Sequence, residues 1–169
     1  LRQWSTLNPE FAFLPRKFKI AISASTADRA AVKAHDVGLY LYRGSGGEAL
    51  LKVLVGGGLG RTPMLGVVIR EALPWRHLTT YVEAVLRVYN RYGRRDNKYK
   101  ARIKILVQVL GAEHFAAEVE REWEQIKDGP ATITAGEYRR VATYFAPPPY
   151  DYVGAGVDAV SFSKYRAEY

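Results

Sequence analysis

The stretch VGLYLYRGSGGEALLKVLV, residues 37–55, indicates how the fold begins. Its two ends, Val37–Arg43 and Ala49–Val55, are rich in Val, Leu and Tyr, which favour β-strands. The connection Gly44-Ser45-Gly46-Gly47 supplies residues that tolerate the backbone conformations of tight turns. The stretch therefore predicts two strands joined as a hairpin.

Two more strands are predicted on either side of this hairpin. From Lys17 to Ser23 the residue character alternates with a period of two, so that Phe18, Ile20 and Ile22 share one face of a strand. The other face would carry Lys17, Lys19, Ala21 and Ser23. Val67 to Arg70 is the fourth predicted strand.

Helical periodicity takes over after the strands. Apolar residues three and four positions apart predict helices at about residues 78–92, 100–110 and 112–127. A fourth helix is expected after Thr134, where Thr134-Ala135-Gly136-Glu137 fits a capping box. Strands followed by helices predict the α+β class, with an N-terminal, mostly antiparallel sheet and a helical segment packed on it.

The same pattern suggests three segments along the chain. Residues 1–13 would be an N-terminal lead-in, and residues 14–146 one α+β domain. Pro147-Pro148-Pro149 ends the last helix, so residues 147–169 are expected to form a Pro-rich linker towards a missing downstream domain.

Composition excludes several classes of function. The chain has 169 residues, of which 48% are hydrophobic and 25% charged, so it can bury a core and is not a low-complexity segment. It has no cysteine, which excludes a disulfide, a thiolate nucleophile and a thiolate ligand to zinc or to an iron–sulfur cluster. The three histidines are widely spaced, and no metal site is expected.

No apolar run is long enough to span a membrane, and no secretory signal pattern begins the chain. We therefore expect no membrane partner and a cytoplasmic location. Because the chain starts at Leu1 without an initiator Met, we interpret it as an excerpt of a longer protein.

The first candidate site is Arg16-Lys17-Phe18-Lys19. On a strand, Lys17 and Lys19 would project from one face with their Cα atoms about 6.5 to 7 Å apart, so both ammonium groups could converge on one small anion. A solvated strand face with ordinary lysines is the alternative.

The second candidate site is Gly56-Gly57-Gly58-Leu59-Gly60-Arg61, which directly follows a predicted strand. Consecutive glycines allow backbone N–H groups to approach a carboxylate or phosphate, and Arg61 would add charge. The stretch lacks the spacing of a dinucleotide fingerprint and the lysine of a P-loop, so nucleotide binding is not indicated. A tight loop at the end of the sheet explains the glycines equally well.

The third candidate site is the segment from Arg94 to Lys104, which carries a net charge of +5. If a helix begins near Asn97, its positive N-terminal end would attract a polyanion. Nucleic acid and a cofactor with several carboxylates both fit, as does a solvated basic surface. The basic residues are Arg94, Arg95, Lys98, Lys100, Arg102 and Lys104.

Taken in order, several motifs resemble the central region of the sirohaem-dependent nitrite and sulfite reductase family. They are Phe13-Leu14-Pro15-Arg16-Lys17-Phe18-Lys19, His35-Asp36-Val37-Gly38-Leu39, Leu54-Val55-Gly56-Gly57-Gly58-Leu59-Gly60 and the segment 94–104. The string LPRKFK followed about forty residues later by VGGGLG is the most specific part. The resemblance covers roughly residues 11–123.

In that family, sirohaem lies against a 4Fe–4S cluster through a shared cysteine thiolate, and the pair delivers six electrons to sulfite or nitrite. The resemblance implies that Lys17 and Lys19 bind the anion and help to supply protons. It also implies that other residues hold the eight sirohaem carboxylates, namely Arg16, Gly56, Gly57, Gly58, Arg61, Lys98, Arg102 and Lys104. A flavoprotein or a ferredoxin would donate the electrons in the parent enzyme, whose remaining domains would contact this chain.

The chain departs from the family pattern because the four cluster cysteines are absent. A cysteine-free chain cannot ligate the cluster or the sirohaem iron, so we predict that it is inactive alone and binds neither cofactor stably. A basic nucleic-acid-binding module is the main alternative, supported by the net charge of +8 and the twelve tyrosines, although we do not expect nucleic acid as a partner. A purely structural fragment is the third interpretation.

Overall fold

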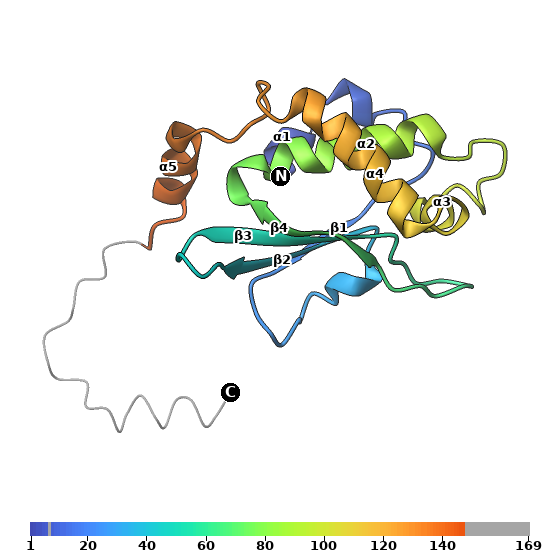
Figure 1. The fold of residues 1–169 in the computed structure, drawn as a ribbon, viewed down its shortest axis with the longest axis horizontal. Helices are drawn as coiled ribbons and strands as arrows, with labels where there is room; N and C mark the ends of the chain where they lie inside the picture. Colours follow the sequence, from blue (N-terminus) through green and yellow to red (C-terminus); the bar gives the residue numbers. More distant parts are fainter. Residues whose placement is uncertain (7, 148–169) are drawn as a thin grey trace, which may run out of the picture. The chain divides into compact units, whose positions relative to one another are not determined.

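The computed structural model describes residues 1–6 and 8–147, and the chain divides into two compact units, residues 1–134 and 135–169. The first unit contains a four-stranded sheet in the order β1-β2-β3-β4. Helices cover one face of this sheet (Figure 1). The strands are β1 (Ile20–Ser23), β2 (Val37–Arg43), β3 (Ala49–Val55) and β4 (Val67–Pro74). The α+β class is confirmed, and most of the predicted linker, residues 148–169, lies outside the described residues.

The predicted hairpin forms with the predicted bounds. β2 pairs antiparallel with β3 over the full length of both strands, from Val37 opposite Val55 to Arg43 opposite Ala49. In the turn, the N–H of Gly44 donates to the carbonyl of Glu48 (2.9 Å), and Gly47 adopts a φ of 81° that favours glycine. Alternate residues of both strands enter the core, as the period of two requires. They are Val37, Leu39, Leu51, Val53 and Val55.

The first strand is shorter than predicted. The prediction began at Lys17, whereas β1 begins at Ile20, and it runs parallel to β2. The N–H of Val37 still donates to the carbonyl of Lys19 (3.1 Å), but β2 offers no earlier residue with which to pair. The face of β1 that carries Ala21 is covered, because Ala21 is buried against Val32 of the 3₁₀ helix η2 (Val32–Ala34).

The fourth strand is longer than predicted. β4 extends to Pro74 instead of ending at Arg70, and its pairing with β3 shifts register between Leu51 and Leu54. Pro74 lies at the end of the strand, where its missing N–H costs no ladder hydrogen bond.

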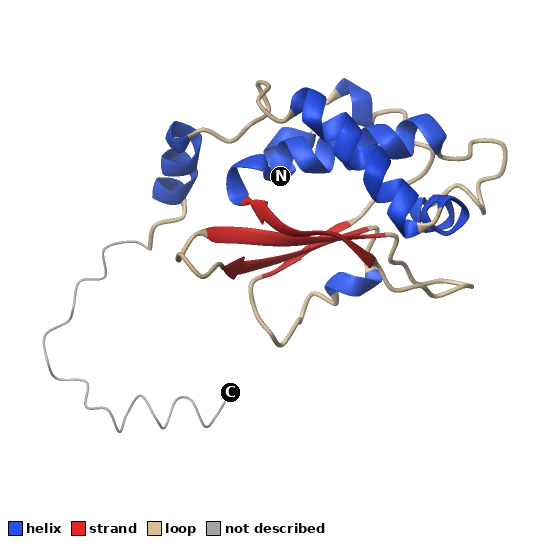
Figure 2. Cartoon of the chain, viewed as in Figure 1, coloured by secondary structure: helices blue, strands red, loops and turns tan. Residues whose placement is uncertain are grey.

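Helices of the first unit form a layer above the sheet (Figure 2). α2 (Leu78–Tyr92) has the predicted bounds, and α4 (Ala112–Ile126) ends one residue earlier than predicted. α3 (Ile103–Leu110) begins three residues later than predicted, because the backbone is still extended at Arg102. The expectation of a helix beginning near Asn97 is therefore wrong. No described helix is both long and apolar enough to cross a membrane.

The remaining elements are short. The N-terminal segment forms α1 (Arg2–Ser5) and the 3₁₀ helix η1 (Pro9–Phe11), and Leu1, Trp4 and Phe11 pack against the main core. The 3₁₀ helix η3 (Trp75–His77) joins β4 to α2. In the second unit, α5 (Ala135–Tyr144) confirms the helix predicted after Thr134.

Aromatic residues connect α2 and α4 inside the core. The hydroxyl of buried Tyr81 donates to Glu120 (2.7 Å), which also accepts from Arg70 of β4 (2.7 Å). The Arg70 guanidinium lies 4.8 Å from the ring centroid of Trp123. Burial, reinforced by the Glu120 carboxylate, raises the pKa of Tyr81, so its hydroxyl remains a hydrogen-bond donor. These contacts fix the helix layer to β4.

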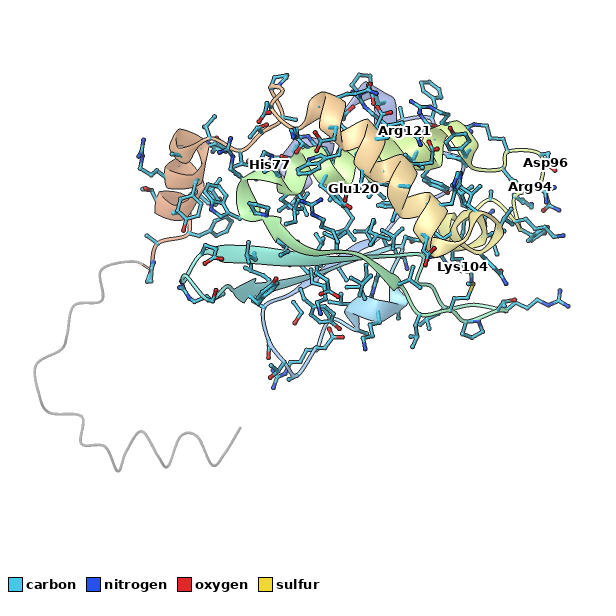
Figure 3. All side chains as sticks on the ribbon, in the orientation of Figure 1. His77, Arg94, Asp96, Lys104, Glu120 and Arg121 are labelled. Carbon is cyan, nitrogen blue, oxygen red and sulfur yellow. The ribbon has the colours of Figure 1, made fainter. Side chains whose placement is uncertain are left out.

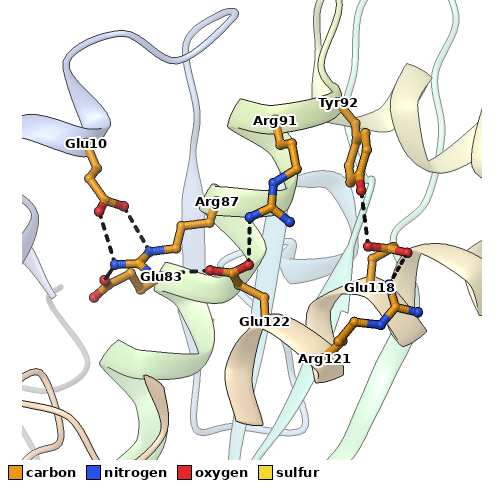
Figure 4. A network of polar contacts seen from close by, with 8 residues as sticks. All are labelled: Glu10, Glu83, Arg87, Arg91, Tyr92, Glu118, Arg121 and Glu122. Carbon is orange, nitrogen blue, oxygen red and sulfur yellow. Dashed lines mark hydrogen bonds and ion pairs between the residues drawn. The ribbon is translucent and has the colours of Figure 1, made fainter. Parts of the chain in front are cut away.

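Charged side chains hold the outer surfaces of the same helices together (Figure 4). Arg87 of α2 forms ion pairs with Glu10, Glu83 and Glu122, which come from three different elements or segments. Glu118 of α4 accepts from Arg121 and from the hydroxyl of Tyr92. The network thereby links the N-terminal segment, α2 and α4.

A substitution at Gly57 tests how tightly the loop after β3 is packed. A Cβ atom at this position would lie 2.3 Å from the carbonyl oxygen of Lys33 and 2.5 Å from that of His35, and both are backbone atoms. We expect Gly57→Ala to lower the free energy of unfolding by about 2 kcal/mol or more in a denaturant titration. Gly46→Ala is the control, because its Cβ would meet only the flexible side chain of Glu48. Equal stability of the two variants would contradict this packing.

Candidate functional site

The centre of the predicted basic site is an acidic residue, Asp36. Its side chain is fully buried at the start of β2. One carboxylate oxygen accepts from Arg102 Nη2 (2.6 Å) and Nε (3.2 Å), and the other accepts from the backbone N–H of Lys19 (3.0 Å). The backbone carbonyl of Asp36 accepts from the N–H of Gly56 (3.0 Å). Asp36 therefore joins the segment before β1, the loop after β3 and the start of α3.

Arg102 lies at the N-cap of α3 and contacts Asp36 instead of pointing into solvent. Its side chain is only 20% exposed. A guanidinium that binds a carboxylate through two nitrogens is held in a fixed orientation. The structure thus shows Arg102 as part of the internal framework of the site.

Lys104, labelled in Figure 3, is the second residue of the same helix. It is buried. Its ammonium group donates to the carbonyl oxygens of Thr62 and Leu59, which belong to the loop between β3 and β4. Burial, together with the nearby Arg102 guanidinium, lowers the pKa of the Lys104 ammonium. Lys104 thus holds the glycine-rich loop against α3.

The glycine-rich loop uses much of its own backbone. Gly56 donates to Asp36, and the N–H of Gly58 donates to the carbonyl of Met64 (2.9 Å). A Cβ on Gly58 would lie 3.1 Å from Arg102 Nη2 and 3.2 Å from Lys104 Cδ. Two of the three amides in the predicted anion cradle are therefore already bound within the chain. This geometry favours the tight-loop interpretation for Gly56 and Gly58.

Arg16 and Lys98 also meet. Arg16 Nη1 donates to the backbone carbonyl of Lys98 (2.7 Å), which ties the segment before β1 to the loop between α2 and α3. The Lys98 side chain remains exposed, with its ammonium 5.3 Å from the ring centroid of Tyr99. Arg94 and Asp96 form an ion pair in the same loop, as Figure 3 shows.

Lys17 and Lys19 are both exposed, on either side of half-buried Phe18. The Lys19 backbone is fixed by Asp36 and by Val37, and Arg61 is exposed on the loop between β3 and β4. The structure therefore separates the predicted site residues into two groups. Arg16, Arg102 and Lys104 bind acceptors of this chain, whereas Lys17, Lys19, Arg61 and Lys98 extend into solvent.

Sequence reasoning missed the role of Asp36 and of Tyr89. Tyr89 is buried and donates to the carbonyl of Ala101 (2.8 Å), and burial together with the charge of Asp36 raises its pKa to about 12. Tyr92, three residues later in the same helix, is exposed. The available signal was a lone acid placed directly before an apolar strand, since a buried carboxylate needs a cationic partner.

Most of this chain is similar in sequence to known proteins. The sequence profile of the nitrite and sulphite reductase 4Fe-4S domain matches residues 1–127. Sulfite reductase (ferredoxin) 1 of Mycolicibacterium paratuberculosis is 36% identical over 126 residues, which cover 73% of this chain and 22% of that protein. The sulfite reductase (NADPH) hemoprotein beta-component of Chromohalobacter salexigens is 34% identical over 115 residues, which cover 64% of this chain and 20% of that protein.

A solved structure agrees with these sequence matches. The Mycobacterium tuberculosis NirA protein superposes with a TM-score of 0.63 at 35% sequence identity, over 73% of this chain and 23% of that one. The chain therefore spans about a fifth of the length of the relatives that it matches.

The Asp36–Arg102 pair can be tested by removing its negative charge. Asp36→Asn keeps the shape of the side chain but leaves the largely covered Arg102 guanidinium, which is 20% exposed, without a counter-ion. We expect the free energy of unfolding to fall by about 3 kcal/mol in a denaturant titration. Asp96→Asn is the matched control, because Asp96 pairs with Arg94 in solvent and should contribute little. A loss at Asp36 no larger than that at Asp96 would show that the pair does not hold the site together.

Proposed function

Because the chain belongs to the nitrite and sulphite reductase family, we propose that it is part of a sirohaem- and 4Fe–4S-dependent enzyme that reduces sulfite or nitrite by six electrons. The observation that carries this proposal is the local arrangement of the LPRKFK segment. Both of its lysines are exposed, and the backbone between them and β1 is anchored to a buried carboxylate. The boundaries of the α+β domain, at residues 14 and 146, also remain predictions.

The residues of this chain fit one of the two cofactors and not the other. A 4Fe–4S cluster needs thiolate ligands, and the chain has no cysteine, so the cluster and the sirohaem iron would be ligated by other parts of the parent enzyme. The sirohaem carboxylates need cations, and Lys98 and Arg61 are exposed and able to approach them. Arg102 and Lys104 would act behind them as part of the framework, since Arg102 already binds Asp36 and Lys104 binds the carbonyls of the loop between β3 and β4.

The cofactors would supply the electrons, and this chain would handle the anion and protons. Two ammonium groups beside a doubly or singly charged oxyanion favour its binding and stabilise the negative charge that builds up as electrons arrive. Each substrate oxygen leaves as water, which requires two protons, and a lysine ammonium is a proton donor that solvent can recharge. Because the Lys19 backbone is held by two hydrogen bonds, only its side chain has to be ordered on binding.

The electron donor and the choice of substrate belong to the whole enzyme. Relatives named for ferredoxin and for NADPH both match this chain, so a ferredoxin or a flavoprotein fits as donor. Sulfite and nitrite are both small oxyanions that two lysines could bind. The remaining domains of the parent enzyme complete the proposed site.

Substitution of the two lysines tests this proposal in the parent enzyme. We expect Lys17→Ala or Lys19→Ala to lower the turnover of sulfite or nitrite by about 100-fold, because a charge directed at the reacting oxyanion is lost. The thermal midpoint should change little, since both side chains are exposed. Lys33→Ala removes another exposed lysine as a control. Turnover within twofold of wild type for both site variants would overturn the assignment.

The alternative of nucleic-acid binding is weakened by the partners of the basic segment. Arg94 pairs with Asp96, Arg95 donates to Asn90 and to the carbonyl of Phe13, and Arg102 and Lys104 are bound as described above. Among the six basic residues of the segment 94–104, all of which the structure describes, this leaves the ammonium groups of Lys98 and Lys100 without a hydrogen bond or ion pair. The segment is therefore a poor polyphosphate surface.

Salt dependence distinguishes the two functions. Six free cations would contribute a slope of roughly −5 to a log–log plot of DNA affinity against salt, whereas two would contribute about −2. We expect weak binding of random duplex DNA at physiological salt, measured by fluorescence anisotropy. In a Lys98→Ala/Lys100→Ala variant, the slope of log affinity against log salt concentration should become shallower by about 2. Tight binding at physiological salt that disappears in the Lys98→Ala/Lys100→Ala variant would favour the nucleic-acid module.

A further inference from the structure

The sheet has an open edge at β1. β1 is the terminal strand in the sheet order and pairs only with β2. An edge strand presents unpaired N–H and C=O groups, which form a template for another strand unless something covers them. β1 carries no proline, and Ile22 in its middle is 45% exposed. This edge is therefore available for pairing.

The register shows which backbone groups are free. Ile20 lies opposite Val37, and the N–H of Val37 donates to the carbonyl of Lys19. In a parallel ladder the groups of alternate residues face the same neighbour, so those of Ala21 and Ser23 face β2. The N–H and C=O groups of Ile20 and Ile22 consequently face outwards. No hydrogen bond to them comes from the described parts of the chain outside the sheet.

A groove of about 640 Å³ lies beside this edge. The side chains of Ile20 and Ile22 share the helix-covered face of the sheet with Val37 and Leu39, their partners in register. The N-terminal segment forms the opposite wall, and the lining is mainly apolar. The apolar lining residues include Trp4, Phe11, Leu14, Phe18, Ile20 and Ile22.

Three cations also line the groove, namely Arg2, Arg16 and Lys17, and no acid lies among the lining residues. A ligand that pairs with the β1 edge and fills the groove would thus be an extended chain with alternating apolar and acidic side chains. Main-chain hydrogen bonds would supply affinity, and the alternate side chains would supply specificity.

We propose that the open edge of β1 and the adjoining groove bind an extended, acidic and apolar segment from another part of the parent enzyme. The chain spans about a fifth of its relatives, so the parent polypeptide has ample length to provide such a segment. This proposal does not rest on the reaction assigned to the lysines, because it depends on the backbone of Ile20 and Ile22.

A second copy of this chain is a poorer occupant of the edge. Each copy carries a net charge of +8, so two copies brought together at this edge repel each other. An acidic segment experiences the opposite, favourable interaction with the cations of the groove.

Amide hydrogen exchange, measured by NMR on the 169-residue chain, tests the proposal. The probe is the peptide acetyl-TVEVEVT-amide, and acetyl-TVKVKVT-amide is the matched control. Without peptide, the Ala21 amide should exchange slowly and those of Ile20 and Ile22 rapidly. With the acidic peptide at ten times its dissociation constant, the Ile20 and Ile22 amides should slow by about tenfold. The basic peptide should leave them unchanged.

Two variants distinguish pairing of the peptide with the β1 edge from non-specific binding of the peptide. Ile22→Pro removes one outward N–H without removing a hydrogen bond to β2, and it should abolish the protection of Ile20 while Ala21 stays slow. If Ile22→Pro does not fold, Arg2→Glu reverses one groove cation on an exposed residue and should weaken the acidic peptide, whereas Arg29→Glu outside the groove should not.

Two results would overturn the proposal. The first is unchanged exchange at Ile20 and Ile22 with the acidic peptide at millimolar concentration. The second is protection of these amides that rises with chain concentration in the absence of peptide, together with a dimer in sedimentation, which would assign the edge to a second copy. Neither result depends on turnover, so this proposal and the reductase proposal can fail separately.

Discussion

The arrangement of the whole basic corner depends on one buried carboxylate. A charged group removed from water is tolerated only where cations and N–H donors replace the lost hydration. Asp36 obtains these partners from Arg102 and from the backbone of Lys19, while its own carbonyl binds Gly56. Three segments far apart in the sequence are therefore fixed relative to each other by a single residue. The positions of the candidate lysine, the glycine loop and the start of α3 all follow from it.

This constraint gives a physical reason why the basic residues of the site divide into two groups, those bound within the chain and those exposed to solvent. Arg102 and Lys104 lie deep enough for burial to matter. Arg102 binds the Asp36 carboxylate, and Lys104 holds the loop between β3 and β4. Lys17, Lys19 and Lys98 remain solvated and keep their donors available. A polycarboxylate would meet the second group, on a surface whose shape is maintained by the first. The backbones of Lys19 and Lys98 are already held, so that the loss of freedom when the anion arrives falls mainly on their side chains.

Local patterns predicted the parts of the fold whose causes are local. The hairpin of β2 and β3 and the helix α2 have the predicted bounds, because turn glycines and apolar periodicity lie within each segment. The starts of β1 and α3 were predicted three residues early. Pairing with β2 sets the start of β1, and the Asp36–Arg102 contact accompanies the start of α3. The sequence also indicated the basic residues of the site but not which of them are buried. That division depends on Asp36, which is 66 residues away from Arg102.

The segment before β1 connects the anchored corner to the open edge. Lys19 is bound to Asp36 on one side of this segment, while Arg16, Lys17 and Phe18 line the groove on the other. Lys17 therefore has a backbone that is less restrained than that of Lys19, because no hydrogen bond to a partner strand reaches it in the described structure. A chain seated along β1 would pack against the same short segment and narrow the range of Lys17 conformations. Completion of the sheet by the rest of the enzyme would then also bring the two lysines into a common, fixed geometry, which links assembly of the domains to preorganisation of the anion site.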